Sequence, residues 1–76
     1  MPNAYLAVHT AAGTSPEVVT ALEAIEQVTE AHVVAGNYDL IVELEAEDTG
    51  DLLPVVTREI QGIDGVGATR TYIVLE

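Results

Sequence analysis

The sequence predicts an α+β fold in which two helices cover one face of a four-stranded antiparallel sheet. Two features of the 76-residue chain favour this fold. Residues 38–47 alternate between apolar and polar side chains, which is typical of a strand with one buried face. Helix-start signals stand at residues 13–17 and 48–54, each after a strand-like stretch. The chain therefore divides into two similar halves, each of order strand, helix, strand, which meet at Gly36-Asn37.

The first half carries the signals of a strand, a helix and a second strand. Alternation in the first segment places Leu6 and Val8 on one face. Thr14 and Ser15 offer a hydroxyl that caps the helix, and Pro16 fits the first helical turn. The expected elements are a strand over residues 5–11, a helix over residues 16–27 with Val18, Leu22 and Ile25 as its apolar stripe, and a short strand over residues 32–35.

A tight turn at Gly36-Asn37 is expected to join the second and third strands, because both residue types accept the positive φ values of a two-residue hairpin. The second half then repeats the order of the first. Pro54 is tolerated in the first turn of a second helix, and Gly62 suits its end. The expected elements are a strand over residues 38–47 with Leu40, Val42 and Leu44 on one face, a helix with Leu52, Leu53, Val56 and Ile60 as its apolar stripe, and a strand over residues 65–76.

Right-handed crossovers join two such units into a ferredoxin-like βαββαβ sheet with both helices on one side. Residues 1–76 are then expected to form a single domain. The other sheet face would stay open and expose several apolar side chains together. Because a contiguous apolar patch usually marks a contact surface, we expect a homodimer that packs sheet against sheet. The predicted patch consists of Tyr5, Ala7, Ile41, Tyr72 and Val74.

The chain is strongly acidic, with 13 Asp and Glu residues against 2 basic ones and a formal net charge of −11. Nucleic acids and anionic membranes are recognised by clustered Lys and Arg, so no direct binding to either is expected. The acidity has two explanations: halophilic adaptation to a salty cytoplasm, in which charge repulsion is screened, or recruitment of a basic partner. We favour salt adaptation, because the carboxylates are spread over both halves.

Residue types that are missing exclude further classes of function. The chain has no cysteine, which excludes disulfides, thiol catalysis and cysteine metal sites. No apolar run approaches the roughly 20 residues that span a bilayer. The N-terminus leads directly into a strand-like segment without a signal peptide. We therefore expect a soluble cytoplasmic protein, and we expect no cofactor.

Five short segments follow one another at characteristic spacings. They are Gly13 after the first strand, Val28 after the first helix, Gly36-Asn37-Tyr38-Asp39-Leu40 at the central hairpin, Ile63-Asp64-Gly65-Val66 after the second helix, and Thr69-Arg70-Thr71-Tyr72-Ile73-Val74-Leu75 at the end. Their joint order and spacing resemble the effector-binding (RAM) domain of the Lrp/AsnC, or feast/famine, transcription regulators. The resemblance covers nearly the whole chain.

The resemblance implies a domain that dimerises through its sheets, assembles into rings and binds amino acids or similar effectors between dimers. Family members commonly carry an N-terminal helix-turn-helix, and this sequence has none. The resemblance therefore implies a stand-alone sensor that modulates transcription through a partner, such as a full-length relative. Two alternatives stay open: a pure assembly module without a ligand, and a small dimeric ferredoxin-like enzyme. We expect no enzyme, because no paired acid and base or activated nucleophile emerges.

A zwitterionic amino acid requires contacts to both of its charges. The Gly36-Asn37 turn offers backbone N–H groups to a carboxylate, and Asp39 accepts an ammonium group. Tyr38 supplies a wall, while Thr69 and Thr71 supply hydroxyls from a nearby strand or a neighbouring subunit. The same residues also fit a structural role, in which Gly36-Asn37 is only a turn, Asp39 caps it, and the threonines are strand formers.

The residues that bind metals in other proteins show no local ligand spacing here, so no metal site is expected. A set of His9, His32 and Glu43 would require neighbouring strands. We expect the histidines instead to join Arg70 in neutralising Glu43 and Glu45 at the subunit contact. The acidic run from Glu43 to Asp51 is interpreted as a solvated strand end followed by favourable acids at a helix start.

Overall fold

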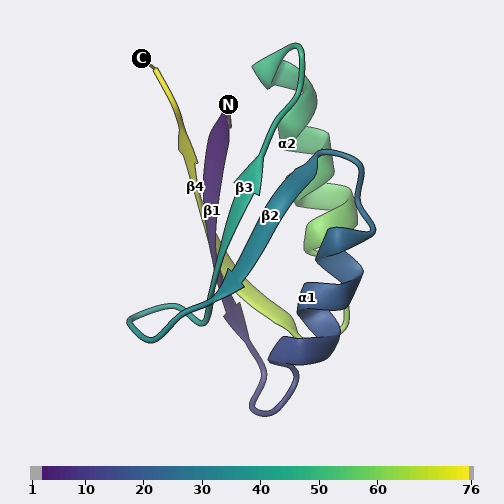
Figure 1. Ribbon diagram of the computed structural model, residues 1–76. Coiled ribbons are helices and arrows are strands. Elements are labelled where there is room, and N and C mark those ends of the chain that lie inside the picture. Colours follow the sequence, from purple (N-terminus) through teal and green to yellow (C-terminus); the bar gives the residue numbers. More distant parts are fainter. Residues whose placement is uncertain (1–2, 76) are drawn as a thin grey trace.

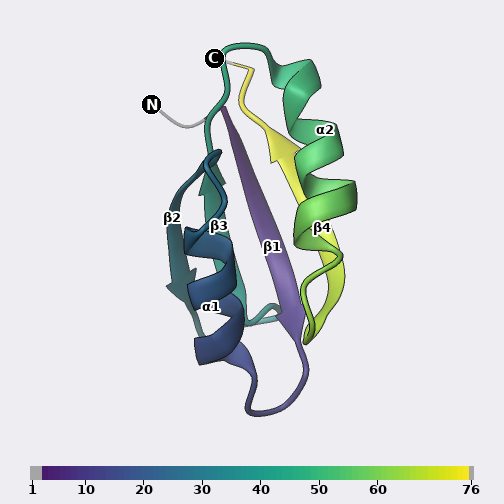
Figure 2. The same cartoon turned by 90° about the vertical axis from the view of Figure 1, so that its right-hand side faces the viewer.

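The computed structural model describes residues 3–75, which form a single sheet with helices on one of its faces (Figure 1). The elements are β1 (Ala4–Thr10), α1 (Ser15–Glu23), β2 (Val28–Val33), β3 (Leu40–Leu44), a continuous helical segment made of η1 (Thr49–Asp51), α2 (Leu52–Pro54) and η2 (Val55–Ile60), and β4 (Val66–Ile73). The strand order is β2-β3-β1-β4, and all neighbours pair antiparallel. Figure 2 shows α1 and α2 side by side over the same face. The predicted βαββαβ arrangement is confirmed.

The core lies between the sheet and the two helical segments. Alternation along β1 and β3 turns every second side chain inward, as the sequence predicted. The helices close this layer with aliphatic side chains, since the chain has no Phe or Trp. The largest fully buried side chains are Leu6, Val8, Val18, Leu22, Leu40, Val42, Leu44, Leu52 and Ile60.

The second helical segment departs from a regular α-helix, and this changes its buried stripe. It begins as a 3-10 turn, passes through one α turn and widens into a π segment, in which Gln61 N–H donates to the Val56 carbonyl at 3.0 Å. The predicted placement of Leu53 in the stripe is wrong, because Leu53 is 66% exposed while Val55 is buried. The irregular winding shifts the side chains away from the regular α-helical spacing.

The first helix and its neighbours also differ from the predicted boundaries. Ala24 and Ile25 donate their N–H groups three residues back, which tightens the last turn and ends α1 at Glu23. As a result β2 begins at Val28 rather than residue 32. The predicted hydroxyl cap is wrong, because Thr14 has no capping bond and its Oγ1 donates to the Ala11 carbonyl at 2.7 Å.

The open sheet face carries the predicted tyrosines, but Ile41 and Val74 of the predicted patch are only partly exposed. Tyr5 and Tyr72 are directly opposite each other and 39% and 58% exposed. Ala7 is buried, although the prediction had it exposed. Its short side chain lies in a central strand between longer cross-strand neighbours, Ile41 and Arg70. No helix between residues 3 and 75 is long and apolar enough to cross a membrane.

Candidate functional site

The central hairpin connects β2 to β3 through a longer loop than the sequence predicted. The last pair of the ladder is Val33 with Leu40, so residues 34–39 form the connection. Val34 N–H donates to the Asp39 carbonyl at 2.9 Å. Within the described residues, positive φ values occur at Gly13 and Gly65 and not at Gly36 or Asn37, so the predicted tight turn is wrong. A six-residue loop spreads the reversal over several residues and does not require left-handed backbone.

Asp39 is fixed to the end of β1 by its side chain and its backbone. Its Oδ2 accepts a hydrogen bond from Thr10 N–H at 2.8 Å, and its own N–H donates to the Val8 carbonyl at 3.0 Å. The same Oδ2 lies 3.7 Å from Nδ1 of His9, and both side chains are about half exposed. Asp39 therefore anchors the loop while part of its carboxylate faces solvent.

Tyr38 connects the loop to both β1 and β4. Its ring stacks on the imidazole of His9, with centroids 4.2 Å apart and planes inclined by 27°. Its hydroxyl accepts a hydrogen bond from Nε of Arg70 at 2.9 Å. That bond raises the pKa of Arg70 above its ordinary value, so the guanidinium is charged at any working pH.

These contacts bring four residues from three segments together, which we call the hairpin cluster: His9, Tyr38, Asp39 and Arg70. The cluster presents one cation, one carboxylate, a phenol and an imidazole at the loop end of the open face. Gly36 and Asn37 lie beside it as exposed loop residues. The sequence analysis placed Arg70 and His9 on the open face but not in the ligand site. The alternation of β4, together with the scarcity of cations in the chain, is the signal from which Arg70 could have been found.

Thr69 and Thr71 lie on the opposite face of β4 from Arg70. They pair with Val8 and Leu6, whose side chains point into the core, whereas Arg70 pairs with Ala7. Thr69 Oγ1 accepts a hydrogen bond from Nε2 of Gln61 at 3.0 Å. A shallow hollow at the β4 edge is lined by Tyr38 and residues 68–72, so the threonines border the cluster without their hydroxyls joining it.

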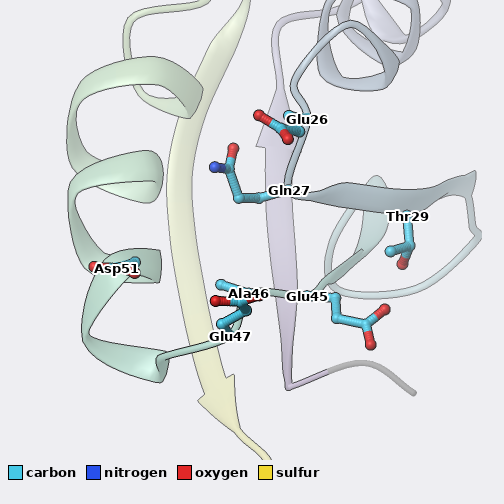
Figure 3. A pocket seen from close by; sticks show the side chains of 7 residues that line it. All are labelled: Glu26, Gln27, Thr29, Glu45, Ala46, Glu47 and Asp51. Atoms are coloured by element: carbon cyan, nitrogen blue, oxygen red, sulfur yellow. The ribbon is translucent and has the colours of Figure 1, made fainter.

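A second hollow lies at the other end of the sheet and is acidic. Its lining comes from the connection between α1 and β2, the start of β2, the segment after β3, and η1, as Figure 3 shows: Glu26, Gln27, Thr29, Glu45, Ala46, Glu47 and Asp51. Nearby, Asp48 caps η1 by accepting from Gly50 N–H at 2.9 Å, which confirms the predicted acid at a helix start. Across residues 3–75, His and carboxylate ligand atoms converge in threes only at Glu30, His32 and Glu43, outside this hollow.

Comparison with known proteins gives a consistent set of relatives. The chain matches the family described as the Lrp/AsnC ligand binding domain over residues 3–76. It is 33% identical over 61 residues to the regulatory protein AsnC of Escherichia coli, covering 80% of this chain and 40% of AsnC. It is 30% identical over 60 residues to the leucine-responsive regulatory protein of Haemophilus influenzae, covering 79% of this chain and 36% of that protein. The chain thus spans well under half the length of these relatives.

Solved structures of similar length also match. The crystal structure of FFRP-DM1 superposes with a TM-score of 0.91 at 39% identity, and the match covers 99% of this chain and 100% of that one. The hypothetical protein PHS023 from Pyrococcus horikoshii gives a TM-score of 0.90 at 38% identity, and the match covers 100% of this chain and 92% of that one. Both matches extend over the complete βαββαβ unit.

Proposed function

Since this chain belongs to the Lrp/AsnC ligand-binding domain family, we propose that it senses an amino acid and modulates transcription indirectly, through partner regulators. The family is regulatory and non-enzymatic, which sets the enzymatic alternative aside. The observation that carries the proposal is that the hairpin cluster holds a cation, Arg70, bonded to Tyr38, and a carboxylate, Asp39, next to Tyr38 in the chain. One of the relatives is named a leucine-responsive regulatory protein, which supports an amino acid as the effector class.

The cluster offers complementary contacts to both ends of a zwitterion. An arginine side chain has five N–H donors in a planar fork, and the bond to Tyr38 uses one of them. The remaining donors suit a carboxylate, assisted by the backbone N–H groups of Gly36 and Asn37. Asp39 accepts the ammonium group, and Tyr38 forms the wall between the two charges. In this proposal Thr69 and Thr71 act from a neighbouring subunit, because their hydroxyls face away from the cluster of their own chain.

Assembly is the second half of the proposed function. Residues 1–76 act as one domain that dimerises through the exposed Tyr5 and Tyr72 on the open sheet face. Dimers associate further into rings, and the effector binds between dimers. Effector binding then shifts assembly, or the choice of a full-length Lrp/AsnC-type partner, through its different affinity for two states. The net charge of −11 leaves DNA contact to the partner.

The proposal is tested by calorimetric titration of the chain with each of the twenty amino acids. The amino acid that binds the wild-type chain is then titrated into variants of the hairpin cluster. Arg70→Gln and Asp39→Asn are each expected to weaken binding about tenfold or more, since each removes a charge-assisted contact. Arg58→Gln, at the chain's other arginine, is the matched control and is expected to bind normally. The proposal would be contradicted if none of the amino acids gave a heat of binding, or if Arg70→Gln bound the ligand with wild-type affinity.

A ligand-free assembly module is the second candidate, favoured by the outer edge of β4. The edge borders an apolar hollow with Thr49, Leu52, Leu53, Val56, Thr71 and Ile73 in its lining. Leu53 and Ile73 are 66% and 45% exposed there, and such an edge invites contact with another chain. For this candidate, titrations stay blank while co-purification recovers a Lys/Arg-rich protein with a recognition helix.

A further inference from the structure

Three potential metal ligands converge on the open face at the β2 and β3 strands. Nε2 of His32 lies 3.0 Å from Oε1 of Glu30 and 3.7 Å from Oε2 of Glu43. One ligand atom from each of the three residues lies within 4.8 Å of the others. The sequence analysis paired His32 and Glu43 with His9, whereas His9 stacks on Tyr38 in the hairpin cluster. Glu30, and not His9, is the third potential ligand beside His32 and Glu43.

Regular pairing of β2 with β3, just after a β-bulge in β2, creates this convergence. Val28 pairs with Leu44 and Glu30 pairs with Glu43, so two steps along β2 match one step along β3, and Thr29 is the additional residue. Oγ1 of Thr29 donates to the Glu43 carbonyl at 3.1 Å, which fixes the bulge. Beyond the bulge, Glu30 pairs with Glu43 and His32 with Ile41 in regular register, and strand alternation places Glu30 and His32, two residues apart, on the same face. The regular pairing therefore sets Glu30 directly opposite Glu43 and on the same face as His32.

Two carboxylates lie close together here, so a bound cation would relieve the repulsion between them. Glu30 and Glu43 stand directly opposite each other, and like charges in that position repel. The chain as a whole carries a net charge of −11, which adds to the repulsion. The group that faces both carboxylates is the imidazole of His32, a nitrogen ligand that favours transition metals over Mg²⁺ or Ca²⁺.

From this geometry we propose that Glu30, His32 and Glu43 bind a divalent transition metal ion of the Zn²⁺ class. The imidazole nitrogen and the two carboxylate oxygens supply three ligands, and the exposed side chains of Glu30 and His32 leave the remaining coordination positions to water. The strands hold the ligands on a paired ladder, so binding requires only side-chain adjustment. Glu43 pairs with Tyr5 of β1, so the metal site borders the exposed tyrosines Tyr5 and Tyr72 on the open face.

Titration of the full chain with Zn²⁺ in a non-chelating buffer tests the proposal, with Mg²⁺ as the comparison ion. The wild-type chain is expected to bind one Zn²⁺ per subunit and to prefer it strongly over Mg²⁺. Loss of even an outer-shell partner of a metal ligand costs about 10- to 100-fold in affinity, so His32→Gln, Glu30→Gln and Glu43→Gln are each expected to weaken binding about 100-fold or more. Glu17→Gln removes an exposed carboxylate on α1 and is expected to leave Zn²⁺ binding unchanged.

Nuclear magnetic resonance provides a readout that does not depend on any variant. The chain has two histidines, and Zn²⁺ is expected to shift the ring signals of His32 while those of His9 stay in place. Circular dichroism confirms that each variant is folded. Equal affinity for Zn²⁺ and Mg²⁺, or unchanged Zn²⁺ binding in folded His32→Gln, would mean that the acidic surface only attracts cations and would overturn the proposal. Amino-acid titration in the absence of metal reports separately on the hairpin cluster.

Discussion

Replacement of Gly65 by alanine is expected to destabilise the fold strongly. Gly65 has a φ of +96°, a conformation that L side chains rarely adopt. A Cβ at this position would lie 2.8 Å from Oγ1 of Thr14 and 3.1 Å from Cγ2 of Val18. The Gly65 carbonyl also accepts a hydrogen bond from Ala11 N–H at 2.8 Å, which joins the start of β4 to the loop before α1. The backbone therefore has little freedom to move away from the added methyl group.

The magnitude follows from two contributions. Left-handed backbone costs a non-glycine residue about 1–2 kcal/mol, and overpacking against fixed neighbours costs a further 1–3 kcal/mol or so. Gly65→Ala is therefore expected to lower the free energy of unfolding by about 2–5 kcal/mol. Gly13 is the matched control, because it has a φ of +78° but no atom within 4 Å of an added Cβ. Gly13→Ala is expected to lose only the backbone part, about 1–2 kcal/mol.

Urea denaturation of wild type and both variants measures these differences. All three must be compared at one protein concentration, because association with another subunit raises the apparent stability of a chain. In thermal melts of a domain this small, each kcal/mol corresponds to about 4–8 °C. A loss in Gly65→Ala no larger than that in Gly13→Ala would refute the steric part of the reasoning. A gain of stability in Gly13→Ala would refute the backbone part.

Three further predictions concern the core, a helix cap and the surface charge. Leu22→Ala removes a fully buried side chain and is expected to lower the free energy of unfolding in urea by about 2–5 kcal/mol, whereas a loss below 1 kcal/mol or so would contradict the core assignment. Asp48→Ala removes the acceptor for Gly50 N–H and is expected to cost about 1 kcal/mol in the same assay; unchanged stability would mean that water replaces the cap. Raising KCl from 0.1 M to 2 M shortens the screening length from about 10 Å to below about 3 Å and is expected to stabilise the chain, and indifference to salt would exclude salt adaptation.

The fold could be predicted because its signals are local. In β3 the inward residues Leu40, Val42 and Leu44 recur with a period of two, and all three are fully buried. The order of strands and helices then restricts the topology through the handedness of crossovers. The helix-start signals also gave the correct position of the second helical segment, with Asp48 as its cap.

Turn geometry was predicted less well, because it depends on pairing between distant residues. Gly36-Asn37 has the composition of a tight left-handed turn, but the ladder stops at Val33 and Leu40 and leaves a loop too long to require one. The left-handed glycines are Gly13 and Gly65, and at Gly65 the nearest obstacle is Thr14, far away in sequence. The bulge at Thr29 is likewise a property of the β2 and β3 pair and has no marker in the β2 sequence alone.

The candidate site depends on the same long-range pairing. Tyr38 and Asp39 were singled out from the hairpin sequence, yet the cation that completes the cluster, Arg70, is 32 positions away from Tyr38. A zwitterion cannot be held by a carboxylate and backbone N–H groups as firmly as by a carboxylate and a guanidinium, because the charged donor forms the stronger hydrogen bond. β4 therefore supplies the guanidinium of the proposed ligand site. A change in the packing of β4 is expected to weaken effector binding even where the loop of residues 34–39 is unchanged. Gly65→Ala, at the entry to β4, is therefore expected to change both the stability and the amino-acid affinity of the chain. In the folded fraction of this variant, Arg70 is displaced and the affinity for the amino acid falls. Gly13→Ala is expected to leave that affinity unchanged.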